Sequence, residues 1–84
     1  MSNREIAKLF RKLARLMELH GENEFKIRSL SNASFKIDRL ETTLDGLTEK
    51  ELEAIDGIGK SLSKKISTLF TTGRLPELDD LLSG

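Results

Sequence analysis

Apolar residues recur every three or four positions along the first part of this chain, and this spacing restricts the fold more than any other feature. Ile6, Phe10, Leu13 and Met17 fall on one side of a helix with about 3.6 residues per turn. The alternation of apolar and polar residues that marks a β-strand is nowhere convincing. The 84 residues suffice for one small domain. We therefore predict a single all-α domain over residues 1–84, with four main helices.

Caps and glycines predict where the first two helices begin and end. Ser2 or Asn3 can cap the first helix, and Gly21 can end it. A second helix is expected from about 24 to 41. Its phenylalanines do not share one apolar stripe, so we expect a break or burial on two sides near residues 29–34.

The second half of the chain predicts two more helices and a final turn. Thr48 and Glu51 form a capping box, which predicts a short helix over residues 49–55. After a glycine-containing interruption, the apolar spacing resumes and continues to Gly73, which can end a fourth helix. Pro76 can begin a short final turn that runs to about residue 82.

Composition excludes several classes of site. The chain has no cysteine, so disulfides and thiolate metal sites are excluded. It contains no apolar stretch of transmembrane length, and its start lacks the apolar region of a signal peptide. A soluble cytoplasmic protein without a membrane partner is expected, with association with the nucleoid as a further possibility.

The charges are balanced overall but unevenly distributed. The formal net charge is zero, from 14 basic and 14 acidic residues. Residues 41–56 carry six acids and one base, whereas residues 57–74 carry four bases and no acid. A neutral total therefore leaves room for a local basic face that attracts an anionic ligand.

The sequence Gly-Ile-Gly-Lys-Ser at residues 57–61 allows several interpretations. A triphosphate-binding loop needs a glycine where Ala54 stands, and it needs a preceding strand. A dinucleotide-binding loop needs a third glycine where Leu62 stands. Both are rejected. The ordinary interpretation is the end of one helix and a short connection to the next.

Two glycines around an aliphatic residue indicate a more specialised turn. Ile58 can insert between the flanking helices, while Gly57 and Gly59 allow a sharp backbone turn and close approach of a ligand. The amides from Gly59 to Ser61 then lie at a helix N-terminus, where free N–H groups favour a phosphate. Further positive charge comes from Lys60, Lys64 and Lys65.

The segment from Ile55 to Ile66 resembles the helix-hairpin-helix motif of proteins that bind DNA without sequence specificity. It has the Gly-hydrophobic-Gly turn, a small residue at Ser63 and the final aliphatic residue. Two positions depart from the usual pattern, which often has proline where Asp56 stands and alanine where Ser63 stands. The resemblance places the hairpin at about residues 49–72.

The wider order of segments resembles the N-terminal domain of bacterial family X DNA polymerases. The resemblance rests on "ENEFKIRSLSNASFKI", the hairpin and "LFTTGRLPEL". It implies binding at the 5′-phosphate side of a gap, with Lys26 at a phosphate contact and Lys65 at the position of a Schiff-base lysine. Leu30 stands where the family has a tyrosine, and Glu77 stands where it has a basic phosphate contact.

The hairpin resemblance also implies a cation. Turns of this type often hold a monovalent ion, Na⁺ or K⁺, on backbone carbonyls that correspond here to Glu53, Ile55 and Ile58. No other cofactor is expected. The ion would connect the turn to a DNA phosphate and partly offset the charge of Asp56.

We predict sequence-independent binding of duplex, nicked or gapped DNA, in a setting of DNA repair and with repair proteins as partners. No aromatic stacking platform is evident, which disfavours a bare single strand. One alternative is a deoxyribose-phosphate lyase that uses Lys65 as its catalytic residue, although such a lysine is more often a phosphate contact. Another is a protein-interaction module that keeps the fold. The predicted DNA contacts are Gly57, Ile58, Gly59, Lys60, Ser61, Lys64, Lys65 and Lys26.

Overall fold

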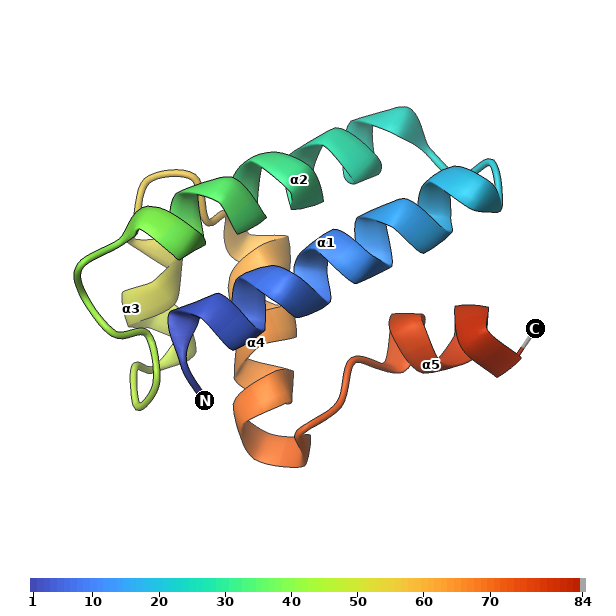
Figure 1. Ribbon diagram of the computed structural model, residues 1–84. Helices are drawn as coiled ribbons and strands as arrows, with labels where there is room; N and C mark the ends of the chain where they lie inside the picture. Colours follow the sequence, from blue (N-terminus) through green and yellow to red (C-terminus); the bar gives the residue numbers. More distant parts are fainter. Residues whose placement is uncertain (84) are drawn as a thin grey trace.

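The computed structural model describes residues 1–83, and these form an all-helical fold, as predicted. Gly84, the last residue of the predicted domain, lies outside the described residues. Helices α1 and α2 lie side by side and run in opposite directions, and α3 and α4 pack below and behind them (Figure 1). The shorter α5 follows the second half of α1. The helices are α1 (Asn3–Leu19), α2 (Glu24–Arg39), α3 (Glu49–Glu53), α4 (Lys60–Thr72) and α5 (Pro76–Ser83).

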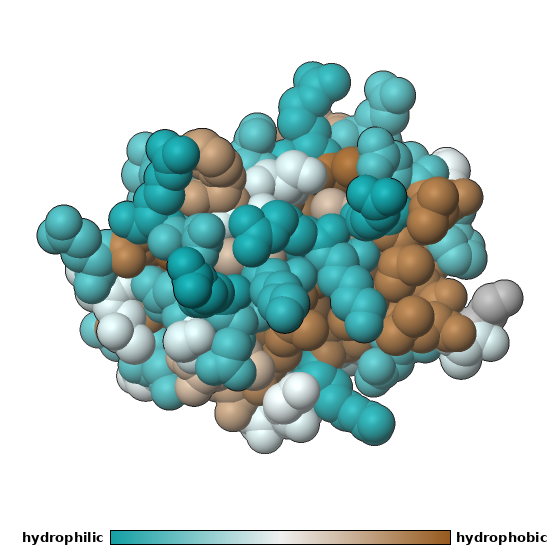
Figure 2. All heavy atoms as spheres, in the orientation of Figure 1, coloured by the Kyte–Doolittle hydropathy of each residue, from teal (hydrophilic) through white to brown (hydrophobic). Residues whose placement is uncertain are grey.

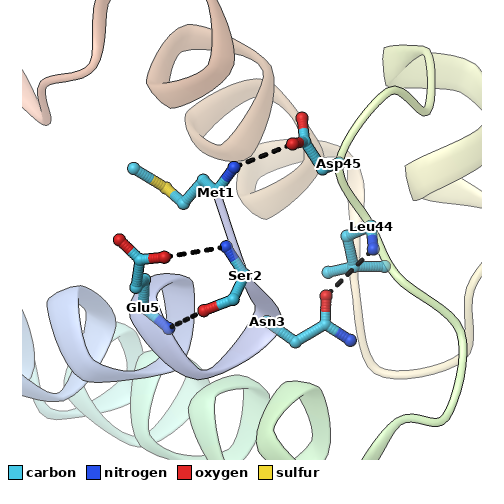
Figure 3. Close-up of polar contacts among 6 residues, drawn as sticks. All are labelled: Met1, Ser2, Asn3, Glu5, Leu44 and Asp45. Carbon is cyan, nitrogen blue, oxygen red and sulfur yellow. Dashed lines mark hydrogen bonds and ion pairs between the residues drawn. The ribbon is translucent and has the colours of Figure 1, made fainter.

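Helix α1 begins at a capping box. The Ser2 hydroxyl accepts a hydrogen bond from the Glu5 amide at 3.1 Å, and the Glu5 carboxylate accepts one from the Ser2 amide at 3.1 Å (Figure 3). Two N-terminal amides are thus satisfied by side chains. Of the two predicted capping residues, Ser2 is therefore the one that caps α1.

Asn3 has a different role, which the sequence did not suggest. Its side chain accepts a hydrogen bond from the Leu44 amide at 2.9 Å and donates one to the Thr42 carbonyl at 2.7 Å. The terminal ammonium of Met1 adds an ion pair with Asp45 at 2.7 Å (Figure 3). These contacts fasten the start of α1 to the loop between α2 and α3.

The core is mainly aliphatic, with Phe10 as its buried aromatic residue, and it is shared by all five helices. It includes one residue of the α3–α4 connection, Ile58, whose side chain is only 2% exposed. The predicted insertion of Ile58 between helices is thus confirmed. Burying these side chains supplies the main driving force for folding. The core also contains Ile6, Phe10, Leu13, Met17, Leu30, Ile37, Leu44, Leu52, Leu62, Ile66, Leu69, Leu75 and Leu78.

Helix α2 differs from the sequence-based prediction because it is continuous and buries one face. Phe25 and Phe35, which did not fit the apolar stripe, are 77% and 57% exposed. The Arg39 guanidinium lies 3.9 Å from the centroid of the Phe35 ring. The prediction of a break or of burial on two sides was therefore wrong, since the misfit aromatics face solvent. The helix also ends two residues earlier than predicted, at Arg39.

The ends of the later helices follow their local signals. Helix α3 is two residues shorter than predicted, because the Ile55 amide bonds to the Leu52 carbonyl, at 3.1 Å, in a tighter turn. Gly73 ends α4 with a left-handed φ of 74°, and its amide bonds to the Leu69 carbonyl at 2.7 Å. The predicted final turn is an eight-residue helix that starts at Pro76.

The surface is uneven in polarity. Hydrophilic side chains cover α1, while hydrophobic atoms gather at the side of the molecule where α1 and α5 end (Figure 2). The exposed apolar side chains include Leu19 and Leu82, which lie near those two helix ends. Among residues 1–83, none of the helices has the length and apolar character needed to cross a membrane.

Candidate functional site

The connection between α3 and α4 contains one position that requires glycine. Gly57 has φ = 91°, a conformation that side-chain-bearing residues rarely adopt. A Cβ added there would lie 2.5 Å from Cδ of Lys36, which extends over the turn from α2. The backbone conformation therefore favours glycine at this position, whereas the flexible Lys36 side chain would only have to shift to admit a Cβ.

Gly59 is different, and here the prediction needs correction. Its backbone is extended, with φ = −82° and ψ = −177°, and an added Cβ would meet no atom within 4 Å. The turn itself does not require glycine at this position. We predicted the same conformational role for both glycines, but the backbone turn needs only Gly57.

Gly59 is the N-cap of α4, and it leaves the start of that helix without a side-chain cap. Helices α1, α2 and α3 are capped by Ser2, Asn23 and Thr48, whereas α4 has no such bond and no acid in its first turn. Within the described part of the chain, the amides of residues 59–62 donate no hydrogen bond. Four free N–H groups and the helix dipole therefore favour an anion at this end.

The free end of α4 opens into a cavity of about 600 Å³ between α2, the turn and α4. Three lysines come together here although they are far apart in sequence: Lys26, Lys60 and Lys65. Two of the predicted DNA contacts do not line this cavity. One is Ile58, which lies in the core. Lys64 is exposed and lines a second, smaller hollow of about 240 Å³. The main cavity is lined by Met17, Phe25, Lys26, Ser29, Leu30, Asn32, Gly57, Gly59, Lys60, Ser61, Leu62, Lys65 and Glu77.

Lys65 is the least exposed of these cations. Its side chain is 21% exposed, and its ammonium forms an ion pair with the Glu77 carboxylate of α5. Burial lowers the pKa of the Lys65 amine below its ordinary value, and repulsion from Lys26 lowers it further. The Glu77 carboxylate acts in the opposite direction, because a neighbouring anion favours the charged ammonium. Burial prevails, and the pKa of Lys65 is lowered.

Asp56, the acidic departure from the motif, has a partner across the turn. Its carboxylate lies 2.9 Å from the ammonium of Lys36. This hydrogen bond and the positive charge of Lys36 lower the pKa of Asp56, so the carboxylate stays ionised near neutral pH. The same Lys36 covers Gly57, so α2 holds the turn from outside.

The three carbonyls predicted to hold a monovalent cation differ in their bonding. The Ile55 carbonyl accepts a hydrogen bond from the Ile58 amide at 3.0 Å. The carbonyls of Glu53 and Ile58 accept no hydrogen bond from any residue in the range 1–83. Two of the three oxygens are therefore available to a ligand, and the cation site stays a prediction.

The sequence analysis missed two side chains at this site. Phe25 lines the cavity and is largely exposed, so an aromatic surface does lie beside the lysines. The failure of Phe25 to fit the apolar stripe of α2 was the signal that could have revealed it. Lys36 lies 20 residues from its partner Asp56, and no local pattern predicts that contact.

Comparison with known proteins gives one match. A family model described as "Helix-hairpin-helix domain" matches residues 1–75, which is most of the chain and includes the whole α3–α4 connection. The match ends just before α5, so Glu77 lies outside it. No curated protein matches the sequence significantly.

Proposed function

Since the chain belongs to the helix-hairpin-helix domain family, whose members generally bind DNA without sequence specificity, we propose that the α3–α4 turn binds the phosphate backbone of DNA. The proposal covers duplex DNA, continuous or interrupted by a nick or gap. It places this binding in DNA repair in the cytoplasm.

The observation that carries this proposal is the uncapped start of α4. Its four free amides lie beside Lys60 and open into a cavity that also holds Lys26 and Lys65. A phosphate there would accept hydrogen bonds from the amides and gain from the helix dipole. Backbone amides contact phosphate oxygens rather than base edges, so the contact carries no sequence information.

The aromatic ring at the rim extends the contact surface. Phe25 and Lys26 both line the cavity, so a phosphate bound by this lysine would place its nucleoside near the ring. Phenylalanine can stack on any base, which adds affinity without sequence preference. We therefore expect exposed bases at a nick or gap to add to the affinity for the backbone.

A titration at several salt concentrations tests the proposal. If two or three phosphates are neutralised, the logarithm of the association constant should fall with the logarithm of salt concentration at a slope of about −2 to −3. Fluorescence anisotropy with a labelled duplex gives the constant directly. A duplex of shuffled sequence should bind equally well.

Two results would contradict the proposal. A strong preference for one of the two sequences would indicate contacts to base edges instead of phosphates. Absence of binding to every duplex at low salt would leave an interaction module that keeps the fold without DNA binding.

A deoxyribose-phosphate lyase is the second candidate, and one observation favours it. A lysine nucleophile must lose its proton, and burial lowers the pKa of Lys65. Against this, the amine is engaged by Glu77, and Leu30 offers no hydroxyl at the cavity wall. We therefore favour a role for Lys65 in phosphate binding over one in covalent catalysis.

A further inference from the structure

The ion pair between Lys65 and Glu77 lies at the place where phosphate binding is proposed. Both residues line the main cavity and also the smaller hollow beside it, so the pair forms part of the wall between them. A typical surface ion pair contributes little to a ligand site, but this pair directly determines the charge of the cavity. With Lys65 engaged by a carboxylate, Lys26 and Lys60 remain as the lysines of the cavity without an acidic partner among residues 1–83.

The position of Glu77 is fixed by its neighbours in the chain. Pro76 restricts the backbone at the start of α5. Leu75 and Leu78, on either side of the pair Pro76–Glu77, are 4% and 6% exposed. Two buried leucines therefore anchor the segment that carries the carboxylate, and Glu77 is held towards the cavity.

A carboxylate in this position affects different phosphates unequally. A phosphodiester within a continuous strand carries one negative charge, whereas a terminal 5′-phosphate carries between about 1.5 and 2 at neutral pH. Repulsion between like charges grows with the product of the charges, so the terminal group is repelled more strongly. The partial burial of Lys65 limits the solvent screening that would weaken this difference.

We propose that Glu77 is a specificity-determining residue that makes the cavity favour the singly charged phosphodiester of a continuous or 5′-hydroxyl strand over a terminal 5′-phosphate. This inference rests on the proposed DNA binding. Glu77 repels the second charge of the terminal group and engages the lysine that would otherwise neutralise it. The α5 segment that carries Glu77 lies outside residues 1–75, the part of the chain that the family model matches.

The experiment compares two nicked duplexes that differ only in a 5′-phosphate or a 5′-hydroxyl at the nick. Both are titrated against the wild-type chain, against Glu77→Gln and against Asp79→Asn. Asp79 is a matched control, because its side chain is 49% exposed, close to the 48% of Glu77, and it lines neither cavity. Circular dichroism checks that every variant remains helical.

The wild type should bind the 5′-phosphate duplex no more tightly than the 5′-hydroxyl duplex. In Glu77→Gln we expect about a tenfold gain for the phosphorylated duplex and about a threefold gain for the other. Asp79→Asn should leave the ratio unchanged. A second variant, Lys65→Gln, leaves the carboxylate without its partner and should shift the ratio further against the 5′-phosphate.

Equal gains for the two duplexes in Glu77→Gln would overturn the inference, as would a wild type that already prefers the 5′-phosphate. Neither result affects the proposed function, which requires only that the duplexes bind. Conversely, failure of the wild type to bind any duplex would reject DNA binding itself and the inference with it.

Discussion

The α1–α2 and α3–α4 connections each contain a glycine with positive φ, but they leave the following helix in opposite states. After Gly21, at φ = 70°, the Asn23 side chain caps α2 by accepting hydrogen bonds from two amides, at 2.8 and 3.2 Å. After Gly57, at φ = 91°, the cap is Gly59, and α4 starts with free amides.

The carbonyls of the two connections do not show this contrast. In the first connection, the Glu22 amide bonds to the Met17 carbonyl at 2.9 Å and the Gly21 amide to the Glu18 carbonyl at 3.1 Å. In the second, the carbonyls of Glu53 and Ile58 have no donor among residues 1–83. The carbonyls of His20, Gly21 and Glu22 likewise have no donor among those residues. The capped or uncapped start of the following helix is therefore what distinguishes the two connections.

The largest expected effect comes from replacing Gly57, with Gly21 as the comparison. Gly57→Val should destabilise the fold by about 1–3 kcal/mol through backbone strain, should displace the Lys36 side chain, and should reduce DNA affinity at least about thirtyfold. Gly21→Val shares the backbone strain, but nothing lies within 4 Å of its Cβ. It should lower stability and leave affinity unchanged. Chemical denaturation and anisotropy titration measure the two quantities.

This pair of variants tests whether the turn contributes more than stability. If a folded Gly57→Val protein binds DNA as well as the wild type, the α3–α4 turn is not the binding element. If Gly21→Val weakens binding as much as Gly57→Val does, loss of stability alone explains both results.

The next largest effect should follow from adding a side-chain cap to α4 and from removing the side-chain cap of α2. Gly59→Asp gives α4 a side-chain cap, which should stabilise the fold by a few tenths of a kcal/mol. The same carboxylate would occupy the free amides and repel phosphate, so we expect about a tenfold loss of DNA affinity. Asn23→Ala should instead cost about 1 kcal/mol of stability without a change in affinity.

Thermal unfolding measures the stability of both variants, and DNA titration measures their affinity. A Gly59→Asp protein that is stabilised and still binds DNA at the wild-type level would show that the free amides do not contact phosphate.

A smaller effect is expected from Lys65→Ala, which removes one cation near the uncapped helix end. Because this loss leaves the Glu77 carboxylate unpaired in the cavity, affinity should fall about threefold and the salt slope should become less steep by about one. Lys8→Ala removes an equal charge from the exposed side of α1 and should change neither value.

The same lysine variant separates binding from catalysis. We expect no adduct when the wild type is treated with borohydride and DNA that carries an incised abasic site. An adduct that forms with the wild type and disappears in Lys65→Ala would establish a Schiff base and make this a lyase.

The smallest expected effect concerns the free carbonyls of the second connection. Replacing K⁺ by tetramethylammonium at constant ionic strength should weaken DNA binding about twofold to threefold, because the large ion cannot approach the carbonyls of Glu53 and Ile58. Titration in the two salts measures the difference. Equal affinities would remove the cation from the mechanism.

The fold was largely predictable because its signals are local. The capping box at Thr48 and Glu51 and the helix-ending Gly73 depend on a few neighbouring residues, and both lie where they were predicted. The outward direction of Phe25 and Phe35 was not predictable, since spacing alone does not show which side of a helix finds a partner.

The site was predictable only in part, for the same reason. The local motif identified the turn, but the contact of Lys36 with Gly57 joins residues of two different helices. The distinction between the two glycines also depends on backbone angles, which the pattern Gly-Ile-Gly does not encode. The engagement of Lys65 by Glu77 likewise depends on the way α5 returns to the cavity.

The charge of the cavity depends on whether helix α5 is packed against the rest of the fold. Along its eight residues only Leu78 is buried, so little apolar surface holds α5 against the rest of the fold. A segment of this kind detaches at a free energy well below that of global unfolding. Whenever α5 detaches, Glu77 leaves Lys65, and the cavity gains a free cation until the helix returns. We therefore expect two charge states of the cavity. The state with Glu77 in place dominates, because Leu75 and Leu78 anchor its segment, and a doubly charged ligand should bind the rarer state.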